Sequence, residues 1–283
     1  MLKSNLFDSI VRRALQEDVG AKDITTLSLI PKGMVTKAEI EFKEKGILCG
    51  IEIAEHVFRL VDENLRFLPV AKDGELVEKK REIAYIEGAA ASILVAERTA
   101  LNFLSHLSGI ATFTKAFVDK IKGTQAKILD TRKTTPGLRT LEKYAVAVGG
   151  GQNHRSGLFD EALIKDNHLR ILQKNSLSSI VETVRKTNLK KTVVGVEVKN
   201  LAELKEALKT SANYILLDNM SPETVREAMN LRRRAGSPIP FEVSGGIRLE
   251  NVRDYAEIGV ERISVGCLTH EPPSIDLSLE IVG

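Results

Sequence analysis

The chain has 283 residues, of which 43% are hydrophobic and 28% charged, values that exclude a disordered or low-complexity chain. Its net charge of +3 is too small for a protein that coats nucleic acid, so any site for a polyanion has to be local. The length allows one barrel of ordinary size or two domains.

The cysteines and the N-terminal residues favour a cytoplasmic protein. Cys49 and Cys267 lie far apart and form no CxxC pair, which is typical of reduced, buried thiols. Residues 1–18 carry acids and lack the uninterrupted apolar region of a secretory signal. The longest stretch without Asp, Glu, Lys or Arg covers residues 99–114, fewer than the roughly 20 residues that span a membrane. We therefore expect no contact with a membrane.

The first third of the chain predicts a mixed, sheet-rich domain. Ser4 can cap a helix over residues 4–17, and a polar loop is expected over residues 18–26. Residues 35–42 alternate apolar and polar side chains as a strand does, and residues 51–61 favour a helix. Further strands are expected over residues 65–70 and 83–86.

A long apolar helix follows, from residue 89 to about residue 121. Because it is apolar on most sides, we expect it to be buried between domains or subunits. Arg98 lies within it and has two interpretations. It is either a functional cation or a structural one, paired with Glu97 or extended along the apolar surface.

From residue 127 onward, strands and helices alternate. Asn200 and Ser221 occupy helix N-cap positions, and Pro222 follows at the first helical position. This alternation predicts parallel βα units and an α/β barrel of the TIM type. The strands are expected over residues 127–129, 162–165, 193–198, 214–217, 241–243 and 262–265, and the main helices over residues 136–148, 176–187 and 248–258.

Reactive side chains stand at the carboxyl end of each predicted strand, and in an α/β barrel these ends meet at the mouth that carries the active site. A group of cations inside a folded core requires anions, which are either internal carboxylates or a ligand. Structural ion pairs therefore remain the alternative to a binding site. The residues in question are Asp130, Arg132, Lys133, Lys165, Glu197, Asp218, Ser244, Gly245, Gly246 and Gly266.

The turn Ser244-Gly245-Gly246 predicts a phosphate site, because glycine lets backbone N–H groups approach phosphate oxygens closely. Glu197 and Asp218 suit Mg²⁺ or ribose hydroxyls, or else neutralise Lys165 and Lys199. His106 and His168 are interpreted as structural, since no His or Cys set has zinc spacing.

Two other classes of function are compatible with parts of the sequence. Lys165 could form a Schiff base with a phosphosugar, as in an aldolase. The basic segment, together with Arg232, Arg233 and Arg234, could bind nucleic acid, although the small net charge and few aromatic residues argue against this class.

Several segments resemble the quinolinate phosphoribosyltransferase family, and the resemblance runs nearly end to end. It implies an N-terminal α/β sandwich (residues 1–105, rejoined by residues 268–283) and an open, seven-stranded TIM-like α/β barrel (residues 106–267). It also implies a homodimer whose active sites are completed by the neighbouring subunit. The segments are EDVGAKDITT, AERTALNFLSHLSGIAT, DTRKTTPGLRTLEKYAVAVGGGQNHRSGLFDEALIKDNH, VEV, LLDN, EVSGGI and ISVG.

By position, the resemblance also assigns roles. Arg98 matches the arginine contributed across the dimer interface, and the lysines Lys133 and Lys165 match groups that meet both substrates. Glu197 and Asp218 match the acids that face ribose and Mg²⁺, and with the two lysines they form the expected catalytic set. Further substrate-binding residues implied are Thr131, Arg132, His154, Arg155, Ser244, Gly245, Gly246, Ser264, Val265 and Gly266.

The implied reaction joins quinolinate to phosphoribosyl pyrophosphate, with Mg²⁺ as cofactor. Its products are nicotinate mononucleotide, pyrophosphate and CO₂. The cations and His154 would then bind the two carboxylates of quinolinate and the phosphates of the donor and balance their negative charge.

Overall fold

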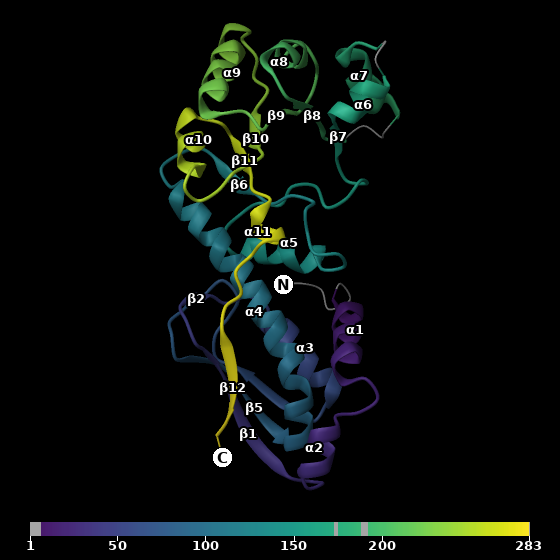
Figure 1. The fold of residues 1–283 in the computed structure, drawn as a ribbon, viewed down its shortest axis with the longest axis vertical. Helices are drawn as coiled ribbons and strands as arrows, with labels where there is room; N and C mark the ends of the chain where they lie inside the picture. The colour runs from purple at the N-terminus through teal and green to yellow at the C-terminus, as the bar shows by residue number, and fades with distance from the viewer. Residues whose placement is uncertain (1–6, 173–174, 188–191, 283) are drawn as a thin grey trace. The chain divides into compact units, whose positions relative to one another are not determined.

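The computed structural model describes residues 7–172, 175–187 and 192–282 (Figure 1). The chain forms two compact units, the first from the described residues of Met1–Lys115, Thr134–Gly150 and Glu271–Gly283, and the second from Ala116–Lys133 and Gly151–His270. The division expected after residue 105 therefore falls inside one continuous helix, α4 (Ala90–Lys120). Residues 134–150, expected in the barrel, group with the first unit because Glu142 binds His106 and Tyr144 binds Asp73.

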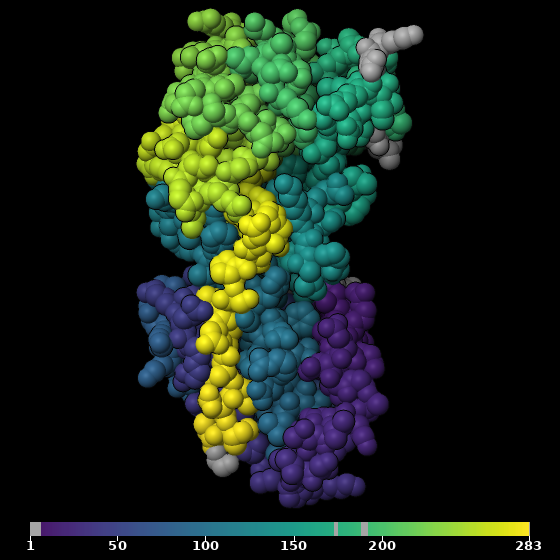
Figure 2. All heavy atoms as spheres, in the orientation of Figure 1, coloured from purple at the N-terminus to yellow at the C-terminus, as the bar shows by residue number. Residues whose placement is uncertain are grey.

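The first unit is built on an antiparallel sheet with the strand order β12-β1-β5-β3. The C-terminal strand pairs with β1, so the tail rejoins the N-terminal domain as the resemblance implies (Figure 2 shows this segment in yellow on the surface). Alternating residues of β1, including Ile40 and Phe42, are fully buried. The elements of this unit, besides the first part of α4, are α1 (Asp8–Val19), α2 (Ile24–Leu29), β1 (Val35–Phe42), β2 (Gly46–Ile47), α3 (Ile51–Val61), β3 (Arg66–Pro69), β4 (Leu76–Val77), β5 (Arg81–Ala89), α5 (Arg139–Val148) and β12 (Leu277–Ile281).

Two expectations for this unit need correction or remain open. The loop expected over residues 18–26 is replaced in part by helix α2, because the Asp23 carboxylate accepts a hydrogen bond from the Thr26 N–H and caps it. The expected cap at Ser4 lies outside the described residues.

The second unit is an open parallel sheet with the strand order β6-β11-β10-β9-β8-β7, and helices connect its strands. The caps expected at Asn200 and Ser221 are confirmed, since both side chains accept a backbone N–H of the helix that follows. The elements of this unit are β6 (Lys127–Leu129), β7 (Ala162–Ile164), α6 (Asp166–Ile171), α7 (Leu177–Thr187), β8 (Val194–Val198), α8 (Leu201–Ala207), β9 (Tyr214–Asp218), α9 (Pro222–Arg234), β10 (Phe241–Ser244), α10 (Val252–Ile258), β11 (Arg262–Ser264) and α11 (Cys267–His270).

The described sheet has six strands, where seven were expected. The segment at the place of the seventh strand makes a single parallel bridge, between Leu129 and Gln152. The ladder stops there because the next N–H available, that of His154, donates to the Asp130 carboxylate at 2.8 Å instead of to a backbone carbonyl. The open α/β architecture is otherwise as expected.

Two helices near the strand ends differ from expectation. Helix α10 begins at Val252, four residues after the predicted start at Arg248. Helix α6 follows Lys165 directly and was not anticipated. Among the helices that the structure describes, none is both long and apolar enough to cross a membrane.

Candidate active site

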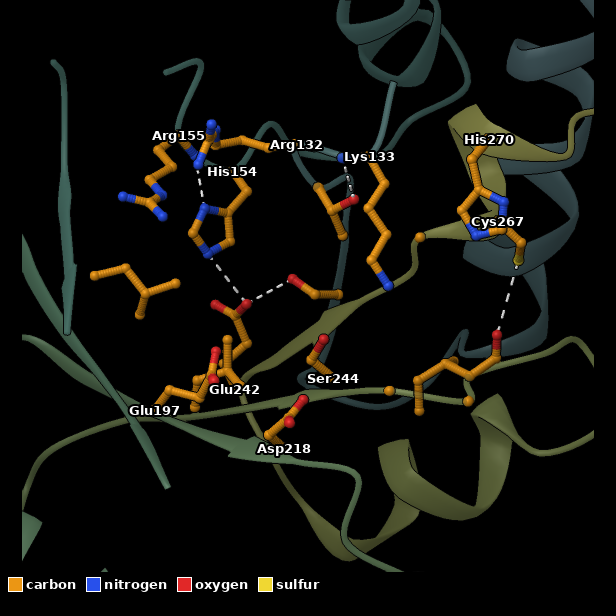
Figure 3. Close-up of a pocket in the computed structure, with 18 of the residues that line it drawn as sticks. Arg132, Lys133, His154, Arg155, Glu197, Asp218, Glu242, Ser244, Cys267 and His270 are labelled. Atoms are coloured by element: carbon orange, nitrogen blue, oxygen red, sulfur yellow. Dashed lines mark hydrogen bonds and ion pairs between the residues drawn. The ribbon is translucent and has the colours of Figure 1, made fainter. Parts of the chain in front are cut away.

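A cavity of about 260 Å³ opens at the carboxyl ends of the parallel strands of the second unit. His154 and Arg155 lie on one side of it, and Asp218 and Ser244 lie on the opposite side (Figure 3). All groups come from this one unit, so the predicted convergence of strand ends holds. The lining residues are Thr131, Arg132, Lys133, His154, Arg155, Leu163, Lys165, Glu197, Leu216, Asp218, Glu242, Ser244, Gly245, Gly246, Ile247, Arg248, Ser264, Gly266, Cys267 and His270.

Cations from four separate segments line the cavity: Arg132 and Lys133 after β6, Arg155 after the bridge at Gln152, Lys165 after β7, and Arg248 after β10. Arg155 is 8% exposed and donates to the backbone carbonyl of Glu161 at 3.2 Å. Since a carbonyl carries no charge, this contact orients the guanidinium without neutralising it.

Lys165 is paired with an acid of the protein. The Lys165 ammonium lies 2.6 Å from a carboxylate oxygen of Glu197, which comes from the neighbouring strand β8. The backbone N–H of Lys165 donates to Nδ1 of His168 at 2.9 Å, so this histidine helps to cap helix α6. Lys199 pairs with Asp166 at 2.6 Å rather than with Glu197 or Asp218.

The turn after β10 requires glycine for a steric reason. Gly245 has φ of +97°, and a Cβ atom there would lie 2.1 Å from Oδ1 of Asn219. Gly246 also has a positive φ, of +64°. The backbone therefore reaches the cavity surface with no side chain in the way, as a phosphate turn requires.

His154 and Glu242 are buried side chains that line the cavity. Nδ1 of His154 accepts the Arg155 N–H at 2.7 Å, and its Nε2 lies 3.2 Å from Glu242. Burial by itself raises the pKa of Glu242. The hydrogen bond and electrostatic attraction of His154, the charge of Arg262 and the hydrogen bond from Ser264 together outweigh burial, so that this pKa lies below its ordinary value. Glu242 is therefore a carboxylate although it is completely buried.

Sequence reasoning overlooked several of the lining residues. For Glu242, the signal was an acid in the middle of a short apolar strand, where an uncompensated charge is unfavourable. Leu163 and Leu216 add a buried apolar wall suited to a flat ring, and nothing in their local sequence marked them as binding residues. Ile247, Arg248, Cys267 and His270 were also overlooked.

Two of the predicted site residues do not line this cavity. Val265 is fully buried, backbone included, and its N–H donates to the carbonyl of Leu129 at 2.9 Å. Arg98 belongs to the first unit, is exposed, and forms no ion pair with Glu97 within the described part of the chain. It lines a separate small cavity with Asn102, Ser105 and Asp276.

Both halves of the chain match one protein family. Residues 110–280 match "Quinolinate phosphoribosyl transferase, C-terminal domain", and residues 23–108 match "Quinolinate phosphoribosyl transferase, N-terminal domain".

Curated relatives and a solved structure agree with this match. The chain is 45% identical over 281 residues to the probable carboxylating nicotinate-nucleotide pyrophosphorylase of Methanocaldococcus jannaschii, covering 96% of each chain. It is 40% identical over 291 residues to that of Mycobacterium leprae, covering 99% of this chain and 100% of the relative. The solved nicotinate-nucleotide pyrophosphorylase of Francisella tularensis superposes with a TM-score of 0.93 at 39% identity, covering 100% of this chain and 98% of that one.

Proposed function

The chain belongs to the quinolinate phosphoribosyl transferase family, and we propose that it transfers the phosphoribosyl group of phosphoribosyl pyrophosphate to quinolinate with loss of CO₂. It is then a pentosyltransferase of NAD biosynthesis that yields nicotinate mononucleotide and pyrophosphate. The observation that carries this proposal is one cavity in which Arg132, Lys133, Arg155 and Lys165 meet a glycine turn and an apolar wall. Such a cavity offers counter-charges for a dicarboxylate and for phosphates, together with a surface for a ring.

Quinolinate is assigned to the side of the cavity formed by Arg132, His154 and Arg155. Arg155 supports this placement because its guanidinium is held by a neutral carbonyl and keeps its charge for a carboxylate. Both nitrogens of His154 already have protein partners, so this histidine serves more to orient Arg155 than to donate to the substrate.

The phosphoribosyl donor is assigned to the opposite side. Ser244, Gly245 and Gly246 offer backbone N–H groups to a phosphate, and Ser264 and Gly266 stand at the adjacent strand end. Glu197 and Asp218 come from the adjacent strands β8 and β9 and offer oxygen ligands of the type that Mg²⁺ accepts together with substrate phosphates. When bound there, Mg²⁺ would neutralise charge on the pyrophosphate group.

The chemistry requires orientation and charge more than acid–base catalysis. The pyridine nitrogen forms a bond to C1 of the ribose while the bond from C1 to the pyrophosphate oxygen breaks, and pyrophosphate leaves with the electron pair. Glu197 and Asp218 stabilise the positive charge that develops on the sugar, and Lys133 and Lys165 stabilise the leaving group. The ribosylated nitrogen then withdraws electrons from the ring. The adjacent carboxylate leaves as CO₂, its bonding pair stays on the ring carbon, and a proton takes its place.

The proposal extends to assembly and location. Arg98 lies outside the cavity described above and is exposed, which suits a residue that enters the site of a neighbouring subunit. We assign it to the quinolinate site of the partner in a homodimer. The cytoplasmic location expected from the sequence stays a prediction.

The direct test is to incubate the purified chain with phosphoribosyl pyrophosphate and Mg²⁺ and to measure release of CO₂ and pyrophosphate. Quinolinate should give both products in equal amounts, whereas nicotinate, which lacks the second carboxylate, should give little of either. Equal pyrophosphate release from the two pyridines, or none from quinolinate, would contradict the proposed function.

A further inference from the structure

Glu242 receives hydrogen bonds from both sides of the cavity. Its Oε1 atom accepts a hydrogen bond from the Ser264 hydroxyl at 2.5 Å and lies 3.2 Å from Nε2 of His154 (Figure 3 shows the contact with His154). Its Oε2 atom accepts a hydrogen bond from Nε–H of Arg262 at 2.7 Å. His154 belongs to the segment assigned to quinolinate, and Ser264 ends the strand assigned to phosphate. A single buried carboxylate thus joins the two halves of the site.

A second set of contacts, made by Tyr214, packs against the hydrogen bonds around Glu242. The Tyr214 hydroxyl donates to a carboxylate oxygen of Glu161 and lies 3.3 Å from Nε2 of His154, and the Arg262 guanidinium stacks over the Tyr214 ring at 4.6 Å. The ring fills the space above Gly195, where a Cβ atom would lie 2.2 Å from it. The network is therefore tightly packed and leaves little room for another arrangement.

The contacts of His154 define which of its ring nitrogens donates a hydrogen bond and which accepts one. Because Nδ1 accepts the N–H of Arg155, the proton of a neutral imidazole resides on Nε2 and points to Glu242. The orientation of the ring, and through it the backbone of Arg155, consequently depends on the acceptor at Glu242.

From these contacts we infer that Glu242 is a positioning residue that sets the dicarboxylate-binding segment at His154 and Arg155 relative to the phosphate-binding strand end at Ser264. It does so through its hydrogen bonds with His154, Ser264 and Arg262. This inference rests on the proposed function for the identity of the two substrates, but the placement of the two segments can be measured without them.

Glu242→Gln is the sharpest variant, because a carboxylate accepts on both oxygens whereas an amide has a single acceptor. Glutamine cannot accept from Arg262 on one side and from both His154 and Ser264 on the other. Glu242→Asp keeps two acceptors at shorter reach and should rescue part of the loss. Glu261→Gln is the matched control, since one carboxylate oxygen of Glu261 accepts both Arg232 and the Phe241 N–H at 2.9 Å, away from the cavity lining, and one amide oxygen suffices for both.

The experiment measures steady-state kinetics of the full-length wild type and the three variants, together with crystal structures of the ligand-free wild type and Glu242→Gln. We expect Glu242→Gln to raise KM for quinolinate roughly tenfold and to lower kcat by a similar factor, while Glu261→Gln keeps the wild-type KM. A merely structural role would reduce the folded fraction, and therefore kcat, with KM unchanged.

The outcomes separate the two claims. If the wild type turns over quinolinate but Glu242→Gln keeps its KM, the positioning role is wrong while the proposed function stands. If the wild type releases no CO₂, the proposed function fails, and the crystal structures alone decide the positioning role. A shift of Arg155 relative to Ser264 in Glu242→Gln supports that role, and superposable segments overturn it.

Discussion

The ammonium of Lys165, directly after strand β7, and the carboxylate of Glu197, in the neighbouring parallel strand β8, lie 2.6 Å apart, and both residues line the cavity. The sequence left open whether these residues form a structural ion pair or a catalytic set; the structure shows the ion pair, and the catalytic role stays a proposal. The side chain of Lys165 is 44% exposed and that of Glu197 only 7%. The lysine side chain is therefore accessible to a substrate. The buried glutamate orients it through the ion pair.

Lys165→Ala should lower kcat by roughly 100-fold or more, because it removes a cation from the leaving-group side of the site. The fold should survive, since the lysine is partly exposed. Pyrophosphate release measures the loss, and circular dichroism measures the fold. Lys199→Ala is the control, because it removes another lysine, one paired with an aspartate at 2.6 Å outside the cavity lining. Near-normal turnover by Lys165→Ala would remove Lys165 from the catalytic set.

Mixing Arg98→Ala with Lys165→Ala subunits should restore activity if Arg98 acts across a dimer interface. After random exchange, half of the dimers are mixed, and each holds one intact site and one doubly damaged site, so we expect roughly a quarter of wild-type activity. Subunit exchange is verified with two differently tagged chains. If exchange is complete and activity stays at the level of the separate variants, Arg98 does not complete the neighbour's site.

Gly245→Ala should weaken binding of phosphoribosyl pyrophosphate more than binding of quinolinate. The added Cβ meets Asn219 at 2.1 Å, and φ of +97° is unfavourable for alanine, so the turn has to move. We expect KM for the donor to rise about tenfold. Gly236→Ala is the control, because Gly236 has φ of +60° but open space around it and lies outside the cavity lining. If both variants raise KM for the donor equally, backbone strain alone explains the change, and the turn at Gly245 is not a specific phosphate site.

Asp218→Asn should reduce the effect of Mg²⁺ on binding of phosphoribosyl pyrophosphate. Calorimetric titration of the donor with and without Mg²⁺ measures this effect independently of turnover, and the affinity of wild type should fall when Mg²⁺ is removed by a chelator. Asp254→Asn, which alters an exposed acid of helix α10 outside the cavity lining, should keep the full response. A response of Asp218→Asn equal to that of wild type would argue against Asp218 as a ligand.

The lowered pKa of Glu242 also predicts how the stability of the fold depends on pH. Its native pKa lies below the ordinary value of 4.5, so the ionised side chain stabilises the fold at pH above 4.5. That contribution is lost as pH falls through the lower native pKa. Urea unfolding between pH 7 and pH 3 should therefore show a smaller loss of stability for Glu242→Gln than for wild type at the acid end. Parallel curves for the two proteins would show that Glu242 does not titrate as assigned.

Local patterns predicted most of the elements. Strand β1 and helix α3 have the predicted bounds, because alternation and helical spacing within a few residues decide them. The missed helix α6 and the late start of α10 both lie next to the strand ends. There, side-chain contacts such as that of His168 with the Lys165 N–H override local propensity.

The sequence by itself determined which charged and glycine residues stand at the strand ends, because a strand and the residue after it are adjacent in the chain. Only the tertiary structure decided which of them meet. It paired Lys165 with Glu197, Lys199 with Asp166, and Glu242 with both His154 and Ser264. The physical reason is that such pairs depend on the order and register of strands in the sheet and on the direction of each side chain. These follow from packing of the whole unit and not from spacing along the chain.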